Sequence, residues 1–430
     1  MGNHRSFRDE QELLLIPAYA KDRQAVPVAA VYGANASGKS NLLDGLKFMA
    51  DAVRDSFGKW SPDGGVPRRP FRPAPGARDQ PSVFAVEFVD GRIRYVYGFE
   101  VDDERVRTEW LHSYPEKRKR VIFERDRDEI KFGTTVGEQR GKLDVLEGLL
   151  RSNALFLSLA GQTNLPLLQP AHRWFTQGMV FRLEGPETDE SEIRRFLLES
   201  VSGKRFAELA KVADFGIARL SLGLPVSSRS DVEFSDSRLR VGVPLLLETA
   251  PAFIDPESLG VLKQILVKNG QLTLGHGTGE EFDLEDESAG TRAWLGLLPA
   301  ALTVLDRGGL LVVDEIDASL HPQLTGRLVA LFRDEEANPH RAQLVFTTHD
   351  ASLLSPSLGD EVLKRDEIWF VEKKSDGASE LYPLTDFHPR KEGENLERRY
   401  LGGSYGAVPS LVAEDFIDAL RGSGGADDPA

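Results

Sequence analysis

The chain has 430 residues, which is long enough for one large domain or two to three smaller ones. Its composition of 40% hydrophobic and 28% charged residues is that of a folded globular protein and excludes a disordered scaffold or a fibre. Its 53 basic and 68 acidic residues leave a net charge of −15, which disfavours a protein that coats DNA through bulk electrostatics but allows a local basic patch. The lack of cysteine excludes disulfides, thiolate catalysis and Cys-bound metal clusters and suits the cytoplasm, and no apolar segment reaches the about 20 residues needed to cross a bilayer.

The first part of the chain predicts a strand, a glycine-rich turn and a helix in succession. Residues 26–32 form an apolar run of strand length. From Leu42 to Val53, apolar side chains recur every three or four residues, which indicates a helix with one buried face. Residues 58–80 are rich in Gly, Pro and Arg and predict a surface loop.

An antiparallel sheet is expected next. Apolar residues alternate over 82–88 and again over 93–101, and Asp90-Gly91 between them is a hairpin-turn dipeptide. Residues 184–222 carry charged and apolar residues at helical spacing without long heptads. We therefore expect a compact helical lid there and not a coiled-coil arm.

The second half predicts a parallel sheet. Short strands follow residue 271, a helix runs to Leu305, and apolar strands cover residues 310–313, 343–346 and 367–371. Buried strands separated by helices are typical of a parallel α/β sheet, so the predicted fold class is α/β. The small, polar tail over residues 421–430 is expected to be disordered.

The glycine-rich turn predicts a phosphate-binding loop. It reads Gly33-Ala34-Asn35-Ala36-Ser37-Gly38-Lys39-Ser40 and satisfies G-x-x-x-x-G-K-[ST]. In such a loop, backbone N–H groups wrap the phosphates, the lysine lies against the β and γ oxygens, and the last hydroxyl, here that of Ser40, holds Mg²⁺. The strand before the loop and the helix after it favour this interpretation over an ordinary glycine-rich turn.

Acidic and imidazole side chains follow two later strands. Asp314 and Glu315 end the apolar strand 310–313, where the first can coordinate Mg²⁺ and the second can polarise an attacking water. His349 follows the next strand and is expected at the same carboxyl edge, within reach of a γ-phosphate. Taken alone, such a histidine is more often packed or solvated.

A second anion site is predicted at Glu287-Ser288-Ala289-Gly290-Thr291-Arg292, just before a helix. The Ser288 hydroxyl, the absence of a side chain at Gly290 and the helix N-terminus suit a γ-phosphate. By itself the same segment is equally well a simple helix cap.

The order of these motifs resembles the ABC-type ATPase head of transporters, chromosome-maintenance proteins and RecF-like repair proteins. Within that superfamily, the phosphate-loop, Glu-Ser-Ala-Gly-Thr-Arg, Asp-Glu-Ile-Asp-Ala-Ser-Leu-His-Pro and Thr-Thr-His-Asp segments and the late Tyr405-Gly406-Ala407-Val408-Pro409 resemble the bacterial RloA or AbiL-type abortive-infection AAA ATPases. The similarity extends from about Asn3 to Pro409. It departs at Ala289, where transporters prefer glycine, and at the start of the chain, where relatives have more of a first strand.

The resemblance implies an ABC-type P-loop NTPase head with a mixed sheet, an antiparallel β subdomain and a helical lid insertion. It divides the chain into an N-lobe at 1–183, the insertion at 184–240, a C-lobe at 241–420 and the tail. It also implies ATP and Mg²⁺ as ligands, with Glu315 and His349 as catalytic residues. Ser40 and Asp314 would bind the metal, and the residues expected to contact nucleotide are Gly33, Asn35, Gly38, Lys39, Ser40, Asn41, Gln162, Ser288, Gly290 and Asp317.

Several of these residues are expected to act between two copies of the chain. Ser288 and Gly290 would touch ATP bound to the opposite subunit, so that nucleotide is sandwiched in a homodimer or a larger oligomer. Asp317 would communicate across the dimer, and His349 would report the γ-phosphate. Gln162 is the candidate for coupling nucleotide to the lobe above, although a surface-loop glutamine has the same appearance.

The functional hypothesis is an ATP-driven switch in anti-phage defence that controls a separate effector such as an RloB-like protein or a nuclease. The alternative is a RecF-like repair ATPase that binds DNA directly, through a basic strip of Arg68, Arg69, Arg72, Lys117, Arg118, Lys119 and Arg120. Solvated surface charge is the more common explanation for such residues. A non-catalytic scaffold is disfavoured because both Lys39 and Glu315 are present.

Overall fold

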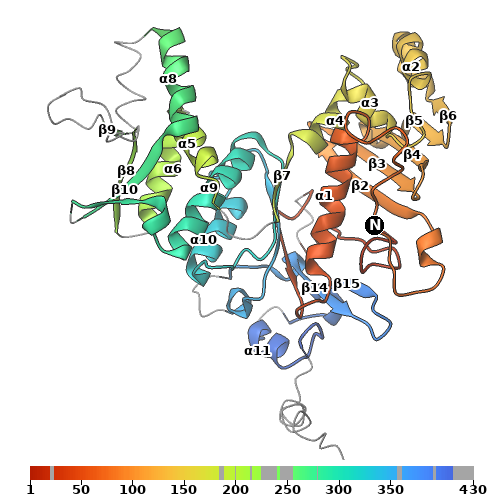
Figure 1. The fold of residues 1–430 in the computed structure, drawn as a ribbon. Coiled ribbons are helices and arrows are strands. Elements are labelled where there is room, and N and C mark those ends of the chain that lie inside the picture. Colours follow the sequence, from red (N-terminus) through yellow and green to blue (C-terminus); the bar gives the residue numbers. More distant parts are fainter. Residues whose placement is uncertain are drawn as a thin grey trace, which may run out of the picture.

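A six-stranded sheet forms the centre of the molecule, in the order β15-β14-β1-β13-β12-β7 (Figure 1). The computed structural model describes residues 1–19, 24–183, 188–198, 200–213, 216–223, 240–242, 255–277, 279–355, 361–390 and 394–409, so the expected tail at 421–430 lies outside the described residues. The central strands are β1 Val28–Tyr32, β7 Met179–Arg182, β12 Leu310–Val313, β13 Gln343–Thr347, β14 Ile368–Lys373 and β15 Ser379–Pro383. All of their pairings are parallel except that between β14 and β15.

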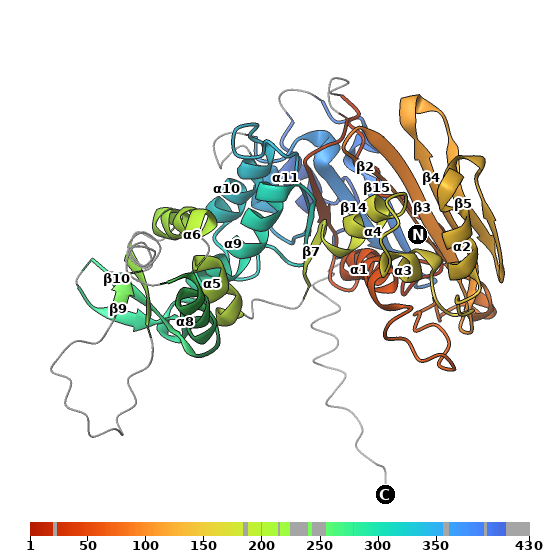
Figure 2. The same ribbon diagram turned by 90° about the horizontal axis from the view of Figure 1, so that it is seen from above.

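Strands β1, β12 and β13 are buried on both faces, and this explains their continuous apolar sequences. In β1, Val28, Ala30 and Tyr32 belong to one hydrophobic core, whereas Ala29 and Val31 belong to the other. The first core includes α9 (Ala289–Arg307) and α10 (Pro322–Arg333), and the second includes α1 (Lys39–Asp55), α3 (Phe156–Gly161) and α4 (Gln169–Thr176). Figures 1 and 2 show these two groups of helices on opposite sides of the sheet.

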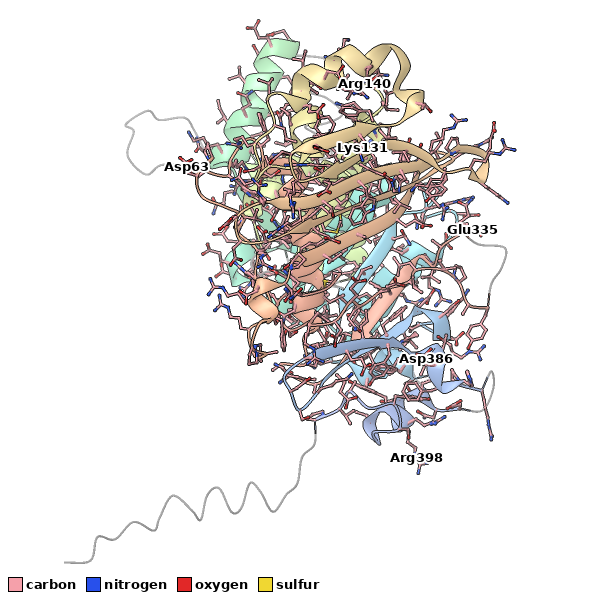
Figure 3. The ribbon with its side chains drawn as sticks, turned by 90° about the vertical axis from the view of Figure 1, so that its right-hand side faces the viewer. Asp63, Lys131, Arg140, Glu335, Asp386 and Arg398 are labelled. Carbon is pink, nitrogen blue, oxygen red and sulfur yellow. The ribbon has the colours of Figure 1, made fainter. Side chains whose placement is uncertain are left out.

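A five-stranded antiparallel sheet covers α1 and forms the outer layer of the second core. Its strands follow chain order: β2 Ser82–Asp90, β3 Ile93–Val101, β4 Val106–Tyr114, β5 Arg120–Asp126 and β6 Glu129–Phe132. The predicted hairpin at Asp90-Gly91 is confirmed, and Gly91 takes the positive φ of 62° that the turn requires. Figure 3 shows this layer face-on, with Lys131 and Arg140 at one end of the view and Arg398 at the other.

The expected helical lid is only partly helical. It contains α5 (Glu190–Leu197) and α6 (Ser200–Ala213), but Ile217–Gly223 forms strand β8. This strand belongs to a small antiparallel sheet with β9 Arg240–Gly242, β10 Gln271–His276 and β11 Glu281–Asp283. The helical prediction was wrong for β8 because Leu220 and Leu222, both buried, follow the two-residue period of a strand.

The remaining α-helices of the described ranges lie at the periphery. They are α2 Arg140–Glu147, α8 Pro256–Asn269 and α11 Leu396–Leu401. Within the described ranges, no helix is both long enough and apolar enough to cross a membrane.

A buried ion pair connects the antiparallel sheet to α3. The Glu109 carboxylate accepts hydrogen bonds from the N–H groups of Phe156 (2.6 Å) and Leu157 (3.0 Å) and lies 3.6 Å from the Arg125 guanidinium. Arg125 in turn donates to the carbonyl of Ala154 at 2.6 Å. Burial raises the pKa of Glu109, while Arg125 and these N–H groups act in the opposite direction.

We predict that Glu109→Ala lowers the free energy of unfolding by about 3–5 kcal/mol, because Arg125 would remain buried without its counter-charge. The matched control is Glu87→Ala at an exposed position of β2. The surface ion pair of Glu87 with Arg94 contributes at most about 1 kcal/mol. Urea unfolding measures both differences. Equal midpoints for the two variants would show that the buried pair contributes no more than a surface pair.

Candidate nucleotide-binding site

The loop at residues 33–40 joins β1 to α1 and is held by its own lysine. Lys39 Nζ donates to the carbonyl oxygens of Gly33 at 2.9 Å and Ala34 at 3.2 Å, and the residue is only 6% exposed. Ala36 and Gly38 adopt positive φ angles of 61° and 118°. The loop therefore curves back on itself at the N-terminus of α1, as the motif predicts.

Close contacts with other strands require both glycines of the motif. A Cβ at Gly33 would lie 2.4 Å from the Val371 carbonyl oxygen, and one at Gly38 would lie 2.4 Å from Ser379 Oγ. Val371 belongs to β14 and Ser379 to β15. The backbone of the loop is thus packed directly against the sheet, and larger residues at these two positions would displace it.

Three further residues expected to contact nucleotide differ in their surroundings. Asn35 and Ser40 are exposed at the outer side of the loop. The Asn41 side chain instead donates from Nδ2 to Ser6 Oγ at 2.8 Å. Ser37 Oγ is buried in the same loop, and it has no hydrogen-bond partner within the described part of the chain.

A threonine on the neighbouring strand contacts the Asp314 carboxylate and the Glu315 backbone after β12. Thr347 Oγ1 donates to Asp314 Oδ1 at 2.5 Å and accepts from the Glu315 N–H at 2.7 Å. The Asp314 N–H donates to the Arg182 carbonyl at 2.8 Å, and Glu315 takes a positive φ of 49°. Sequence reasoning gave Thr347 no role, although a hydroxyl at the end of the strand before His349 was a visible signal.

His349 and Asp317 meet at the same edge. The His349 N–H lies 3.3 Å from both carboxylate oxygens of Asp317. Partial burial and the charge of Lys39 lower the pKa of His349, while Asp317, Glu315 and Asp314 oppose this. Burial also lowers the pKa of Lys39, although the same three carboxylates act to raise it. These five charged or titratable residues come from three separate segments of the sequence, and the three carboxylates lie close enough to act on both Lys39 and His349.

Ser288 and Gly290 lie at the N-terminus of α9. Ser288 is the exposed N-cap of α9, and its Oγ accepts from the Thr291 N–H at 3.1 Å. A Cβ at Gly290 would lie 3.0 Å from the Ser319 carbonyl oxygen. The helix-cap interpretation thus holds for the single chain, and the two residues flank the turn that follows Asp317.

Gln162 lies at the end of α3, away from the loop. Ser158 of the same helix accepts from the Phe57 N–H at 3.1 Å, and Phe57 lies beyond the C-terminal end of α1. Figure 1 shows α3 beside the end of α1 opposite to β15. Gln162 is exposed, and among the described residues no hydrogen bond connects its side chain to the cluster around Lys39.

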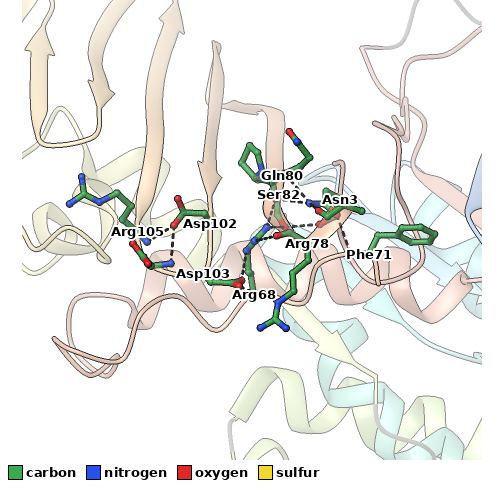
Figure 4. Close-up of polar contacts among 12 residues, drawn as sticks. Asn3, Arg68, Phe71, Arg78, Gln80, Ser82, Asp102, Asp103 and Arg105 are labelled. Carbon is green, nitrogen blue, oxygen red and sulfur yellow. Dashed lines mark hydrogen bonds and ion pairs between the residues drawn. The ribbon is translucent and has the colours of Figure 1, made fainter. Parts of the chain in front are cut away.

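The basic residues considered for DNA do not form one strip. Arg68 is buried and donates to Asp103 at 2.8 Å and to the carbonyls of Gln80 and Arg78, both at 2.6 Å (Figure 4). Lys117 to Arg120 are exposed at the turn between β4 and β5. The strand register places this turn beside Phe88 of β2. Arg68 is bound near Ser82, at the other end of β2, about 20 Å away along the strand. The direct DNA-binding alternative thus loses its main structural support.

The residues present fit Mg²⁺ bound together with a nucleotide. Ser40 and Asp314 offer oxygen ligands, and Ser37 offers an unpaired hydroxyl in the adjoining loop. Throughout the ranges that the structure describes, no group of three or more His, Asp or Glu residues forms a closed metal cage. Mg²⁺ commonly binds through one or two protein ligands plus water and phosphate oxygens, so such a cage is not needed.

Comparison with known proteins agrees with these observations. Residues 28–355 match the family model described as "AAA domain, putative AbiEii toxin, Type IV TA system". Among curated proteins, none matches the chain significantly.

The solved structures similar to this chain include heads of SMC proteins. An SMC head bound to the C-terminal winged-helix domain of ScpA is 16% identical, with 90% of this chain and 97% of that chain covered and a TM-score of 0.44. The SMC head domain from Thermotoga maritima is 14% identical, with 89% and 95% covered and a TM-score of 0.38. An SMC head from Pyrococcus furiosus with an extended coiled coil, bound to the C-terminal domain of ScpA, is 13% identical, with 92% and 93% covered and a TM-score of 0.31.

The fold is α/β, with a mixed central sheet and an antiparallel β subdomain. The matched residues include the phosphate loop, both carboxylates after β12 and His349, and they make up most of the chain. The chain therefore belongs to this AAA-domain family of the AbiEii type.

Proposed function

We propose that the chain binds ATP with Mg²⁺ and hydrolyses it. The observation that carries this proposal is the meeting of Lys39, Asp314, Glu315 and His349 at one sheet edge, where the two carboxylates lie close enough to raise the pKa of Lys39 and His349 against the effect of burial. A cation for the phosphates, a carboxylate for the metal and a second carboxylate for water are the groups that phosphoryl transfer needs. Membership of an AAA-domain family supports the same reaction.

Each residue then has a distinct role. Lys39 and the loop N–H groups would bind the β- and γ-phosphates, and Ser40 and Asp314 would hold Mg²⁺, which when bound neutralises charge on the phosphate oxygens. Glu315 would accept a proton from the attacking water, with its backbone fixed by Thr347. Since the pKa of His349 is lowered, the imidazole would be neutral at pH 7 and could donate one N–H to the γ-phosphate.

We also propose that two copies sandwich the nucleotide. Ser288 and Gly290 would complete the site of the partner, and Asp317, beside His349, would communicate between the two sites. The exposure of Ser288 at the N-terminus of α9 supports this arrangement.

The biological role that we propose is a switch in bacterial anti-phage defence, in which nucleotide state controls a separate effector such as an RloB-like protein. The description of the family as toxins of type IV toxin–antitoxin systems supports a role in such defence. The motif resemblance to RloA and AbiL-type ATPases supports the separate effector.

Lys39→Ala is expected to weaken ATP binding by about 10- to 100-fold, because the loop loses its charge-assisted contact to phosphate. The control is Lys47→Ala, two turns further along α1, where the lysine pairs with Asp51 on the surface. Isothermal titration with MgATP gives both dissociation constants. Parental affinity in the Lys39 variant would contradict the assigned site.

Glu315→Gln is expected to retain ATP binding but to lower kcat by about 100- to 10,000-fold, because the amide cannot accept the proton of the attacking water. Unable to hydrolyse ATP, this variant should accumulate as a nucleotide-bound dimer in gel filtration. The exposed Glu336→Gln should behave like the parent. Hydrolysis at the parental rate by the Glu315 variant would remove Glu315 from the role of base.

Ser288→Arg is expected to leave ATP binding by the single chain intact and to abolish hydrolysis, because the long cation would block engagement of the partner's phosphate. Mixing this variant with Lys39→Ala should restore activity only in mixed pairs, which hold one complete site. Restoration to the full parental rate, or undiminished activity of Ser288→Arg alone, would contradict the shared site.

A further inference from the structure

Two serines that are far apart in the sequence lie against the phosphate loop. Ser6 lies in the N-terminal segment and Ser379 begins β15, and they are 8% and 4% exposed. The Ser379 N–H donates to the Ser6 carbonyl at 2.7 Å, and the two hydroxyl oxygens are 2.7 Å apart. Ser379 Oγ also lies 2.5 Å from the Ser37 carbonyl oxygen. Sequence reasoning assigned neither serine to the site.

Only one assignment of donors and acceptors is consistent with all the contacts of these hydroxyls. At one end, Asn41 Nδ2 can only donate, and it lies 2.8 Å from Ser6 Oγ. At the other end, the Ser37 carbonyl can only accept. Each hydroxyl has a single hydrogen, so Ser6 must donate to Ser379, and Ser379 must donate to Ser37. The result is a continuous chain of hydrogen bonds, which we call the serine clasp, from Asn41 through Ser6 and Ser379 to Ser37.

The clasp begins and ends on the phosphate loop and its helix. It bridges residues 37 and 41 and so encloses Gly38, Lys39 and Ser40, whose N–H groups lie at the N-terminus of α1. It also packs on Gly38 itself, since a Cβ there would lie 2.4 Å from Ser379 Oγ and 2.7 Å from Ser6 Oγ. On the other side of the loop, Lys39 Nζ donates hydrogen bonds to the carbonyls of Gly33 and Ala34. The loop is thus fixed in its curved form without nucleotide.

We propose that Ser379 and Ser6 are positioning residues that preorganise the phosphate loop for nucleotide. This inference rests on the proposed ATP-binding function and adds two residues to it. A loop that already has its bound shape loses less conformational entropy when the phosphates bind. The nucleotide therefore binds more tightly. Neither serine touches the reacting atoms in this scheme, so the clasp acts on binding and not on the chemical step.

The test is Ser379→Ala in the full chain, with Ser6→Ala as a second variant that breaks the same chain of bonds from the other side. Each should raise the Kd and KM for MgATP by about 3- to 10-fold, the range expected for one lost hydrogen bond, and leave kcat unchanged. The double variant should be no weaker than the worse single one, because the hydroxyls act as one unit. Ser375→Ala, an exposed serine in the turn before β15, is the matched control and should bind like the parent.

Thermal unfolding without nucleotide separates this effect from simple destabilisation. A purely structural role would lower the melting temperature and leave the Kd of the folded protein unchanged, and that result in both variants would overturn the clasp. A fall in kcat at constant KM would overturn it as well. If the parent itself does not bind ATP, the proposed function fails and the clasp fails with it, whereas parental binding retained by both variants overturns the clasp alone.

Discussion

The site depends on the parallel register of three neighbouring strands. Val31 of β1 is level with Thr347 of β13, and Val313 of β12 is level with Phe346. Because the strands run in the same direction, the phosphate loop, the two carboxylates and His349 all emerge at one edge. A slip of one residue would turn Thr347 to the opposite face and separate it from Asp314. The apolar contacts on both faces of these strands set the register.

A second constraint is the close packing of backbone around the loop. Three chain segments meet there: the N-terminal residues around Ser6, the loop itself and the start of β15. Gly33 and Gly38 make this approach possible, since each faces an oxygen at a distance that excludes a Cβ. The N-terminal segment is held in turn by Asn3, which donates to the carbonyls of Ala77 and Gln80 at 2.8 Å each (Figure 4). The antiparallel sheet and the phosphate loop are therefore connected through one short segment.

The dimer proposed above would divide each site between two chains. Lys39 is buried against its own loop carbonyls, whereas Ser288 is exposed at the N-terminus of α9. In the proposed dimer, this exposed terminus would supply the donors that the loop lacks on its open side. The buried half of the site would then set nucleotide affinity, and the exposed half would make hydrolysis depend on a second subunit.

The sequence alone located most of the local elements and named the residues of the candidate site. Period-two and period-3.6 patterns located β1, α1, the hairpin of β2 and β3 and the later parallel strands, because each depends on residues close together in the chain. The motif at residues 33–40 indicated phosphate binding from a few adjacent residue types. The helical prediction failed at Ile217–Gly223, where the alternating pattern of β8 is short and follows directly on two helices.

Only the tertiary structure decided which distant groups meet. The burial of Arg68, the place of Gln162 at the far end of α1, the role of Thr347 and the contacts of Ser6 and Ser379 depend on residues tens to hundreds of positions apart. Serine, threonine and arginine are common on surfaces, so their types and spacing contain no signal for such contacts. The strand order and register bring them together, and these are set by packing over the whole chain.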